Sequence, residues 1–270
     1  MGAWPKVLIG VPVFEGTKYC LEEFFESVRA MTYPNADVLL VDNSRGNDFF
    51  EELKKEGDFI VVKDETTAEK PAERLVSSRN LVLDYAIKGG YDYVFALDSD
   101  VVCPKNLVEE LMRFNKDIIS GLYFNYFMVS GKLQIHSVAW RGITPEEFEI
   151  IKQQVRFSDA VKSHEDLQRH LTKQEIDSNG LFEVIYPSAG CMLISKEVFW
   201  KIRYGVPEMQ NKNLTAGGDD IYFMQQARKA GFKAYCHTGF KCDHLIDGKF
   251  KQDSEGRLLH PLNPDYYKKD

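Results

Sequence analysis

Short apolar runs alternate with amphipathic helical segments along the first half of the chain, and this alternation restricts the fold more than any other feature. The runs VLIGVPV, VLLV and YVFAL are continuously apolar, without the alternation of a strand that faces water on one side. Strands of this kind are buried on both faces, as in parallel sheets covered by helices. The sequence therefore predicts an α/β fold with a mostly parallel central sheet flanked by helices.

The same patterns locate the individual elements. Strands are expected at residues 6–13, 37–42, 59–62, 93–97 and 189–195. Helices are expected at residues 19–31, 72–87, 104–114 and 219–230, with glycines after two of them as stop signals. Residues 118–140 favour longer strands or a hairpin that turns at Ser130-Gly131. Residues 144–180 are densely charged and helical in tendency, which favours a pair of solvated helices over a substrate-facing insert.

Composition excludes several classes of protein. The 270 residues are 44% hydrophobic, enough for one large domain or two packed lobes. A net charge of -7 argues against a general nucleic-acid binder. Five cysteines without a CxxC pair fit a reducing compartment better than a disulfide framework. We expect a cytoplasmic protein, because the sequence shows no signal peptide and no transmembrane segment.

Two carboxylates follow the expected strand at residues 93–97, in the sequence Asp98-Ser99-Asp100. Side chains two positions apart on an extended chain point the same way, so the two acids can converge on one point. Hard oxygen ligands suit Mg²⁺ or Mn²⁺, and open α/β sheets bind ligands at the carboxyl ends of their strands. The alternative is an acidic strand end that simply turns in solvent.

Other motifs accompany this DxD motif in a fixed order. They are VLIGVPVFEG, VDNS and SSRN before it and GGDD after it. Together they resemble the GT-A glycosyltransferases, particularly the large family 2-like group, over about residues 6–125 and 187–246. The resemblance implies a Rossmann-like GT-A fold with a smaller mixed sheet on the acceptor side. We expect residues 1–125 to bind the nucleotide sugar, residues 126–247 to complete the same domain as its acceptor-binding and catalytic half, and residues 248–270 to form a polar tail.

The resemblance assigns a set of residues to the nucleotide sugar. In that reading Pro12, Val13 and Phe14 line the nucleobase pocket, and Asp42 hydrogen-bonds the base. An aspartate in DNSRGND is also a common turn cap, so both roles stay open for Asp42. The remaining residues of the set are Arg79, Asn80, Asp98 and Ser99. Arg79 would neutralise the diphosphate or hold the acidic pair, although a helical arginine is more often solvated.

A divalent cation, Mn²⁺ or Mg²⁺, is also implied by the resemblance. Its ligands would be Asp100 as the principal one, Asp98 near the ribose, and His244 in the position of a C-terminal histidine ligand. His237 is the runner-up for that position. A zinc site within residues 236–244 is disfavoured, because the cysteines and histidines there lack the usual CxxC-like spacing.

The stretch GGDDIYFMQQARKAG matches the family's acidic pair at a helix start, with Asp219 in place of the commoner Glu. The resemblance makes Asp219 and Asp220 the catalytic pair and Asp220 the general base, which would take the proton of the acceptor hydroxyl and invert the anomeric carbon. Two acids in a first helical turn also complement the helix dipole without any catalytic role.

The expected function is therefore metal-dependent glycosyl transfer from a nucleotide-diphosphate sugar to an acceptor hydroxyl. The acceptor is a carbohydrate, a lipid-linked group or a protein. One alternative is nucleotidyl transfer to a sugar phosphate, but the stretch PVFEGTKY lacks the glycine-rich basic loop that such enzymes carry after the first strand. The other alternative is a non-catalytic carbohydrate-binding module of the same fold.

Overall fold

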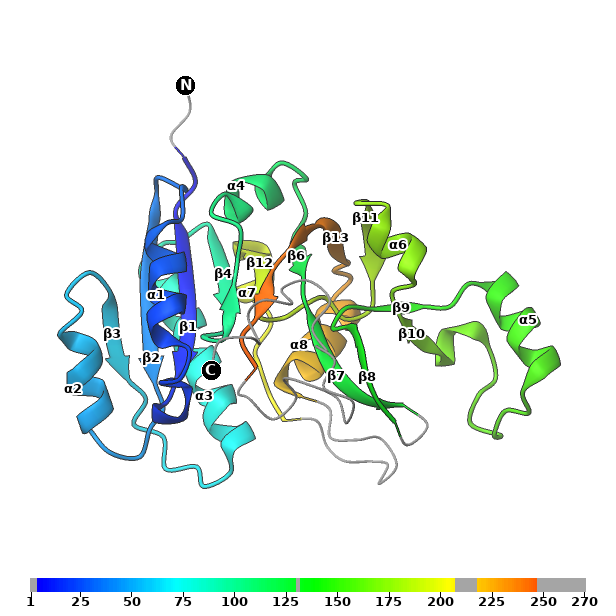
Figure 1. Cartoon of the computed structure of the whole chain (residues 1–270), viewed down its shortest axis with the longest axis horizontal. Coiled ribbons are helices and arrows are strands. Elements are labelled where there is room, and N and C mark those ends of the chain that lie inside the picture. Colours follow the sequence, from blue (N-terminus) through cyan, green and yellow to red (C-terminus); the bar gives the residue numbers. More distant parts are fainter. Residues whose placement is uncertain (1–3, 130–131, 207–217, 247–270) are drawn as a thin grey trace, which may run out of the picture.

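A computed structural model describes residues 4–129, 132–206 and 218–246 (Figure 1). Within these residues the central sheet has eight strands in the order β11-β13-β6-β12-β4-β1-β2-β3. Strands β4, β1, β2 and β3 are mutually parallel, as are β6 and β13. Strand β12 runs antiparallel to both neighbours, and β11 runs antiparallel to β13. The predicted mainly parallel sheet is confirmed, and its mixed part is continuous with its parallel part.

The strands of this sheet have the following bounds: β1 (Val7–Val13), β2 (Ala36–Asp42), β3 (Ile60–Lys63), β4 (Tyr93–Leu97), β6 (Ile118–Leu122), β11 (Leu181–Val184), β12 (Cys191–Ser195) and β13 (Ala234–Lys241). Smaller two-stranded sheets are formed by β5 (Val101–Val102) with β14 (Asp243–His244), β7 (Phe124–Val129) with β8 (Lys132–Ser137), and β9 (Trp140–Gly142) with β10 (Gln168–His170). The helices are α1 (Leu21–Arg29), α2 (Asp48–Lys54), α3 (Pro71–Lys88), α4 (Leu107–Met112), α5 (Pro145–Gln154), α6 (Lys173–Asp177), α7 (Lys196–Phe199) and α8 (Asp219–Lys229), with short 3-10 turns η1 (Glu15–Thr17) and η2 (His164–Asp166).

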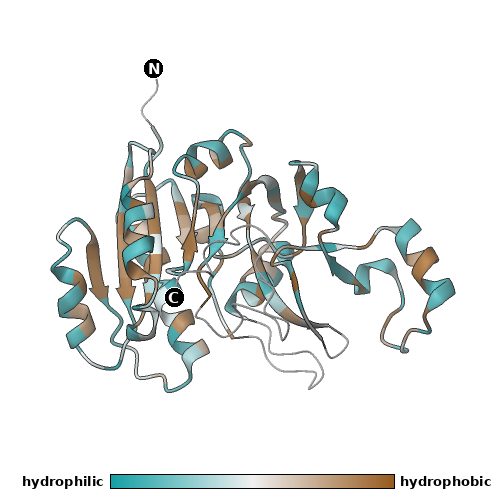
Figure 2. Ribbon diagram, in the orientation of Figure 1, coloured by the Kyte–Doolittle hydropathy of each residue, from teal (hydrophilic) through white to brown (hydrophobic). Residues whose placement is uncertain are grey.

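Helices cover both faces of the sheet, and each face has its own apolar core. One core contains Val82 of α3 and Phe223 of α8, and the other contains Phe24 of α1 and Leu107 of α4. The strands are apolar along most of their length, whereas several helices turn from apolar to polar across their width (Figure 2). This distribution explains why the central strands read as continuous apolar runs, since both of their faces are buried.

Most predicted elements are confirmed within a few residues, but the prediction of a helix pair for residues 144–180 was wrong in part. Between α5 and α6 it contains β10, which pairs antiparallel with β9 instead of continuing a helix. Helix α2 was not predicted, and the helix expected from residue 104 begins at Leu107. The elements α5, β9 and β10 extend beyond β11, at the end of the molecule opposite β3 (Figure 1).

Some predictions fall outside the described residues, namely the Ser130-Gly131 turn, Gly217 of the GGDD motif and the polar tail at residues 248–270. None of the described helices combines the length and the hydropathy that crossing a bilayer requires.

Candidate active site at the carboxyl edge of the sheet

The carboxyl ends of β1, β2 and β4 meet at one edge of the sheet, because these strands are parallel neighbours. Pro12 and Val13 are buried at the end of β1, and Val13 lies beside Asp42 in the register of β2. Phe14, the next residue, is 44% exposed. The three residues predicted to line a nucleobase pocket therefore lie at this edge, and Phe14 presents an exposed aromatic ring there.

Asp42 is fully buried at the end of β2 and is engaged on both carboxylate oxygens. Its Oδ2 accepts a hydrogen bond from Lys63 Nζ at 2.7 Å, and its Oδ1 accepts one from the Ser44 backbone N–H at 2.9 Å. Lys63 Nζ also donates to the carbonyls of Ser44 and Gly46, each at 2.6 Å. Asp42 thus holds the loop after β2, a contact of the turn-capping kind. Lys63 was not predicted as a site residue, although it directly follows the apolar residues of β3 in the sequence IVVK.

A buried arginine links two of the predicted acids. Arg79 of α3 is 6% exposed, and its Nη2 donates to Asp98 Oδ1 at 2.8 Å. Its Nε lies 2.6 Å from Asp219 Oδ2, an ion pair that lacks hydrogen-bond alignment. We call Arg79, Asp98, Asp219 and Asp220 the edge cluster. It ties α3 to the end of β4 and to the start of α8, elements far apart in the sequence.

Asp98 reaches this position because a glycine faces it. A Cβ atom at residue 190 would lie 2.5 Å from Asp98 Oδ2 and 2.9 Å from Tyr123 Oη, closer than atoms can pack. The Gly190 N–H also donates to Tyr123 Oη at 3.3 Å. The small-residue stretch PSAG before β12 therefore admits the Asp98 carboxylate into the edge cluster.

The edge cluster has three carboxylates and one guanidinium, and the pKa values of two of these carboxyl groups, Asp98 and Asp220, are raised. Burial raises the pKa of the Asp98 carboxyl; Arg79 opposes this rise, and the charges of Asp100 and Asp219 add to it. Burial also raises the pKa of Asp220, with a further contribution from Asp219. One guanidinium does not balance the charge of the carboxylates around it, so additional positive charge would stabilise the edge cluster.

Asp100 and His244 meet beside the edge cluster. His244 Nε2 lies 3.4 Å from Asp100 Oδ2, and His244 Nδ1 lies 3.1 Å from the carbonyl oxygen of Phe124. A carbonyl oxygen only accepts, so Nδ1 carries a proton. Nε2 faces the Asp100 carboxylate and donates to it when the ring is protonated, whereas in the neutral ring Nε2 has a lone pair that a metal ion can use. Burial lowers the pKa of His244, but the hydrogen bond and the charge of Asp100 outweigh it and raise the pKa overall.

Of the three predicted metal ligands, the structure brings together Asp100 and His244. The Asp98 carboxylate is turned to Arg79 instead. Across residues 4–129, 132–206 and 218–246, no three or more His, Cys, Asp and Glu side chains are grouped closely enough to hold a metal ion. Asp100 and His244 nevertheless offer one oxygen and one nitrogen donor, and the carbonyl contact at Nδ1 is the usual support of a metal-binding histidine.

Asn80, the neighbour of Arg79, is engaged with another chain segment. Its Nδ2 donates to the Tyr204 carbonyl and its Oδ1 accepts from the Tyr204 N–H, both at 3.0 Å. Both polar groups of the amide are thus used by one backbone, which fixes Tyr204 against α3. Tyr204 has no local sequence signal, because its partner Asn80 lies 124 positions away.

Ser99 and His237 lie in apolar or backbone surroundings. Ser99 is 5% exposed, and its carbonyl accepts a hydrogen bond from Cys20 Sγ at 3.4 Å. The His237 ring packs against Phe114 and Phe240, at centroid distances of 4.9 and 4.4 Å. It is therefore His244, and not His237, that faces the Asp100 carboxylate.

Sequence comparison assigns the chain to a family. The family model for glycosyl transferase family 2 matches residues 9–203, which include the ends of β1, β2 and β4 together with Arg79. The chain belongs to glycosyl transferase family 2. The matched range stops before α8, so the place of Asp219, Asp220 and His244 in the site rests on the geometry above. A sequence search of curated proteins found no match.

The fold of this family 2 chain is similar to that of solved structures. One is the crystal structure of GalNAc-T7 with UDP, GalNAc and Mn²⁺, with a TM-score of 0.58 and 16% sequence identity. The similarity covers 90% of this chain and 44% of that chain, so this chain spans less than half the length of its structural relative. At this level of identity the comparison supports the GT-A fold.

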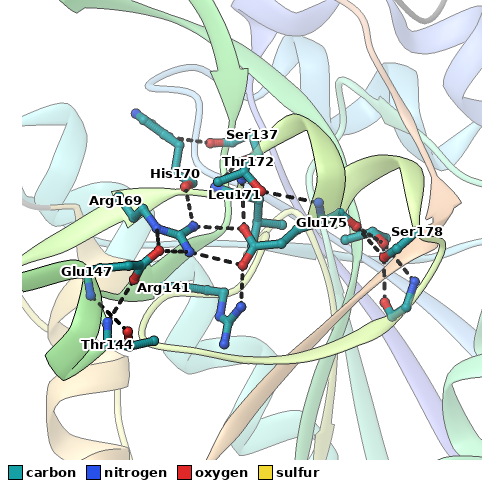
Figure 3. Close-up of polar contacts among 12 residues, drawn as sticks. Ser137, Arg141, Thr144, Glu147, Arg169, His170, Leu171, Thr172, Glu175 and Ser178 are labelled. Carbon is teal, nitrogen blue, oxygen red and sulfur yellow. Dashed lines mark hydrogen bonds and ion pairs between the residues drawn. The ribbon is translucent and has the colours of Figure 1, made fainter. Parts of the chain in front are cut away.

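A second set of charged side chains lies outside the central eight-stranded sheet of this family 2 chain (Figure 3). We call it the outer network; its members are Arg141, Glu147, Arg169 and Glu175. Arg169 lies between the two glutamates, with Nη2 2.7 Å from Glu147 Oε1 and Nη1 2.8 Å from Glu175 Oε2. Arg141 pairs with Glu175 from the other side. Both glutamates also close capping boxes, at the starts of α5 and α6.

The outer network is balanced in charge, and the pKa values of its two glutamates are lowered, whereas those of Asp98 and Asp220 are raised. Burial raises the pKa of Glu175, but hydrogen bonds from Arg169, the Thr172 N–H and Arg141 outweigh it and bring the pKa from 4.5 to about 2. The pKa of Glu147 is likewise lowered, because hydrogen bonds from the Thr144 N–H and Arg169 outweigh burial. We attribute the outer network to stability, because it satisfies its own charges and fixes two helix starts.

Proposed function

We propose that this chain transfers a sugar from a nucleotide-diphosphate sugar to an acceptor hydroxyl, with Mn²⁺ or Mg²⁺ as its cofactor. The observation that carries the proposal is the uncompensated negative charge at the carboxyl edge of the sheet. Arg79 is paired with Asp98 and Asp219, Asp220 adds a third carboxylate, and Asp100 with His244 lies beside them. A divalent cation bound to a diphosphate supplies the positive charge that this edge lacks.

Asp100 and His244 fit the proposed cation better than other side chains of the edge. Carboxylate oxygen with imidazole nitrogen is a donor pair suited to Mn²⁺, and two protein ligands leave positions for phosphate oxygens and water. Asp98 would lie beside Asp100 and His244, near the ribose of the nucleotide. When bound, the cation acts as a Lewis acid that offsets the charge developing on the leaving nucleoside diphosphate.

Asp220 is proposed as the general base. Its raised pKa makes it a stronger base than an ordinary carboxylate, and it is not paired with Arg79 in the way Asp219 is. As the acceptor oxygen forms its bond to the anomeric carbon, the bond from that carbon to the diphosphate oxygen breaks. The acceptor proton passes to Asp220, and the diphosphate leaves with the bonding electron pair. Attack opposite the leaving group inverts the anomeric configuration.

The remaining residues of the edge position these groups. Arg79 holds Asp98 and Asp219 in place, and Pro12, Val13 and Phe14 form an apolar and aromatic border on which a base can stack. Asp42 fixes the loop after β2 through Lys63 and Ser44, and in this proposal that loop borders the nucleobase site. The acceptor is proposed to approach from the side of β7 and β12, because β12 pairs with β4 and Phe124 of β7 contacts His244.

The test is a reaction assay with a panel of nucleotide sugars, comprising UDP-linked hexoses and N-acetylhexosamines and a GDP-linked hexose. Release of nucleoside diphosphate should require MnCl₂ or MgCl₂ and should stop with EDTA. NMR of the glycoside product should show the anomeric configuration opposite to that of the donor. Retention of configuration would remove Asp220 as the base, and the absence of turnover or binding for every donor would overturn the proposed function.

A further inference from the structure

Tyr204 combines deep burial with an unsatisfied hydroxyl. The residue is 5% exposed, and in the described part of the chain its Oη is buried without a hydrogen-bond partner. Leaving a buried hydroxyl unpaired costs about 1–3 kcal/mol, so native proteins rarely do so without a functional reason. The two other buried tyrosines that serve for comparison are bonded: Tyr33 Oη donates to the Pro5 carbonyl at 2.8 Å, and Tyr91 Oη to Asp37 at 2.7 Å.

The position of Tyr204 is tightly fixed. Asn80 holds its backbone from both sides, through the two 3.0 Å hydrogen bonds described above. Its ring stacks on Phe223 of α8 at a centroid distance of 4.4 Å, and the Arg79 guanidinium lies 5.4 Å from its centroid. A residue whose backbone is hydrogen-bonded and whose ring is in contact with Phe223 and Arg79 has little freedom to find another partner for its hydroxyl.

The charges that act on the Tyr204 phenol are those of the edge cluster. Burial raises its pKa; Arg79 opposes the rise, and Asp219, Asp98 and Asp220 add to it. The phenol therefore stays protonated and is available as a donor. Asp219 Oδ2 and Arg79 Nε are also buried without a hydrogen bond among the described residues. Tyr204 thus has an unused donor, and Asp219 Oδ2, which is ion-paired with Arg79 but accepts no hydrogen bond, is held by the same arginine that lies beside the Tyr204 ring.

We propose that the Tyr204 hydroxyl binds the donor's sugar ring, by donating a hydrogen bond to a sugar hydroxyl that itself donates to Asp219 Oδ2. This inference rests on the proposed function. A sugar hydroxyl both accepts and donates, which matches one donor and one acceptor in a buried site. A phosphate group offers only acceptors and carries charge of the same sign as the acids around Tyr204, so it does not suit this position. Tyr204 is thus a binding residue for the sugar and not for the nucleotide.

Tyr204→Phe removes only the oxygen, and Tyr33→Phe is the matched control with a satisfied hydroxyl. The first measurement is the melting temperature without ligand. Tyr204→Phe should leave it unchanged or raise it, because a buried donor without a partner disappears. Tyr33→Phe should lower it by about 2–4 °C, because it loses a hydrogen bond of about 1 kcal/mol. A loss in Tyr204→Phe equal to that of the control would mean that the hydroxyl has a structural partner, and would overturn the inference.

The second measurement is calorimetric binding, with MnCl₂, of the most active nucleotide sugar of the panel and of its nucleoside diphosphate, UDP or GDP. Tyr204→Phe should weaken the nucleotide sugar about fivefold, the value of one neutral hydrogen bond, and leave the nucleoside diphosphate unchanged. Equal affinity of wild type and variant for the nucleotide sugar would overturn the inference alone. If the wild-type protein binds no nucleotide sugar, the proposed function fails and the inference fails with it.

Discussion

The edge cluster and the outer network both pair arginine with carboxylates, but they differ in charge balance. In the outer network two arginines serve two glutamates, and both glutamate pKa values are lowered. In the edge cluster one arginine faces several aspartates, and two aspartate pKa values are raised. The buried atoms Arg79 Nε and Asp219 Oδ2 form an ion pair but make no hydrogen bond among the described residues. A network whose charges and hydrogen bonds are balanced internally stabilises the fold. A network with unbalanced charge can instead bind a ligand that supplies the missing charge and hydrogen bonds.

The largest expected difference between the two clusters is in activity. Asp220→Asn should lower kcat by about 10²–10⁴-fold, because the acceptor loses its general base. Its melting temperature should not fall, because the substitution removes a carboxylate whose charge burial disfavours. Glu175→Gln, the control from the outer network, should keep kcat within about twofold while losing stability. If Asp220→Asn retains more than a tenth of the wild-type kcat, the proposed difference in catalytic role between the two clusters is wrong.

The next difference is in stability, and a matched pair of arginine substitutions measures it. Arg79→Gln should lower the free energy of unfolding by about 3–5 kcal/mol, because Arg79 is itself buried and its loss leaves Asp98 and Asp219 without their cation. Arg169→Gln should cost about 1–3 kcal/mol, since Arg169 is more exposed than Arg79 and Glu175 keeps Arg141. Urea denaturation of both variants provides the values. Equal losses would show that burial and charge imbalance at the edge carry no extra cost.

Glycines next to the two clusters offer a smaller test. Gly190→Ala should cost about 1–3 kcal/mol and weaken metal-nucleotide binding, because the new Cβ displaces the Asp98 carboxylate. Gly142→Ala in β9 should cost less than about 1 kcal/mol, because its Cβ would lie 3.3 Å from the mobile end of the Ile185 side chain. Thermal unfolding and binding of UDP with MnCl₂ compare the two variants. A Gly190→Ala protein as stable as Gly142→Ala would contradict the close contact with Asp98.

The smallest effect is the pH dependence, and its sign differs between the clusters. The lowered pKa of Glu175 contributes stability that is complete above its ordinary 4.5 and is lost as pH falls through about 2. The loss caused by Glu175→Gln, about 1 kcal/mol at pH 7, should therefore become smaller in acid.

The raised pKa of Asp220 lowers stability at pH values above that pKa. In metal-free protein Asp220→Asn should therefore stabilise the fold at pH 7, and this gain should vanish below pH 3.8. Urea denaturation in EDTA between pH 7 and 3 checks both signs. Two variants with the same pH trend would contradict the comparison.

Much of the fold was predictable because its signals are local. The apolar run of β4 followed by Asp98 and Asp100, and the glycine that ends α3, are each encoded within a few residues. Strand β10 was missed because its three polar residues form a strand only by pairing with β9. Helix α2 was missed because its seven residues follow a turn-rich stretch and are too few to show a clear period.

The site was predictable as a set of residue types but not as a set of contacts. The ordered motifs led to Asp98, Asp100 and His244 as joint metal ligands, and they left open whether Arg79 holds acids or a diphosphate. That Arg79 pairs with Asp219, or that Asn80 holds the backbone of Tyr204, depends on the packing of α3 against α8 and the segment before it. Contacts that span more than a hundred residues have no local sequence signal. The partnerless hydroxyl of Tyr204 likewise becomes visible only once the surrounding atoms are placed.

The most direct test of the central claim is the Mn²⁺-dependent rise in melting temperature with UDP, or with GDP if the panel selects it. Any ligand that binds only the folded protein raises the melting temperature. The wild type and Glu175→Gln should show the same Mn²⁺-dependent rise from their own baselines, and Asp100→Asn should show none, because it loses the principal ligand beside His244. A full Mn²⁺-dependent rise in Asp100→Asn would contradict the claim that the unbalanced charge at the sheet edge is the cation-nucleotide site.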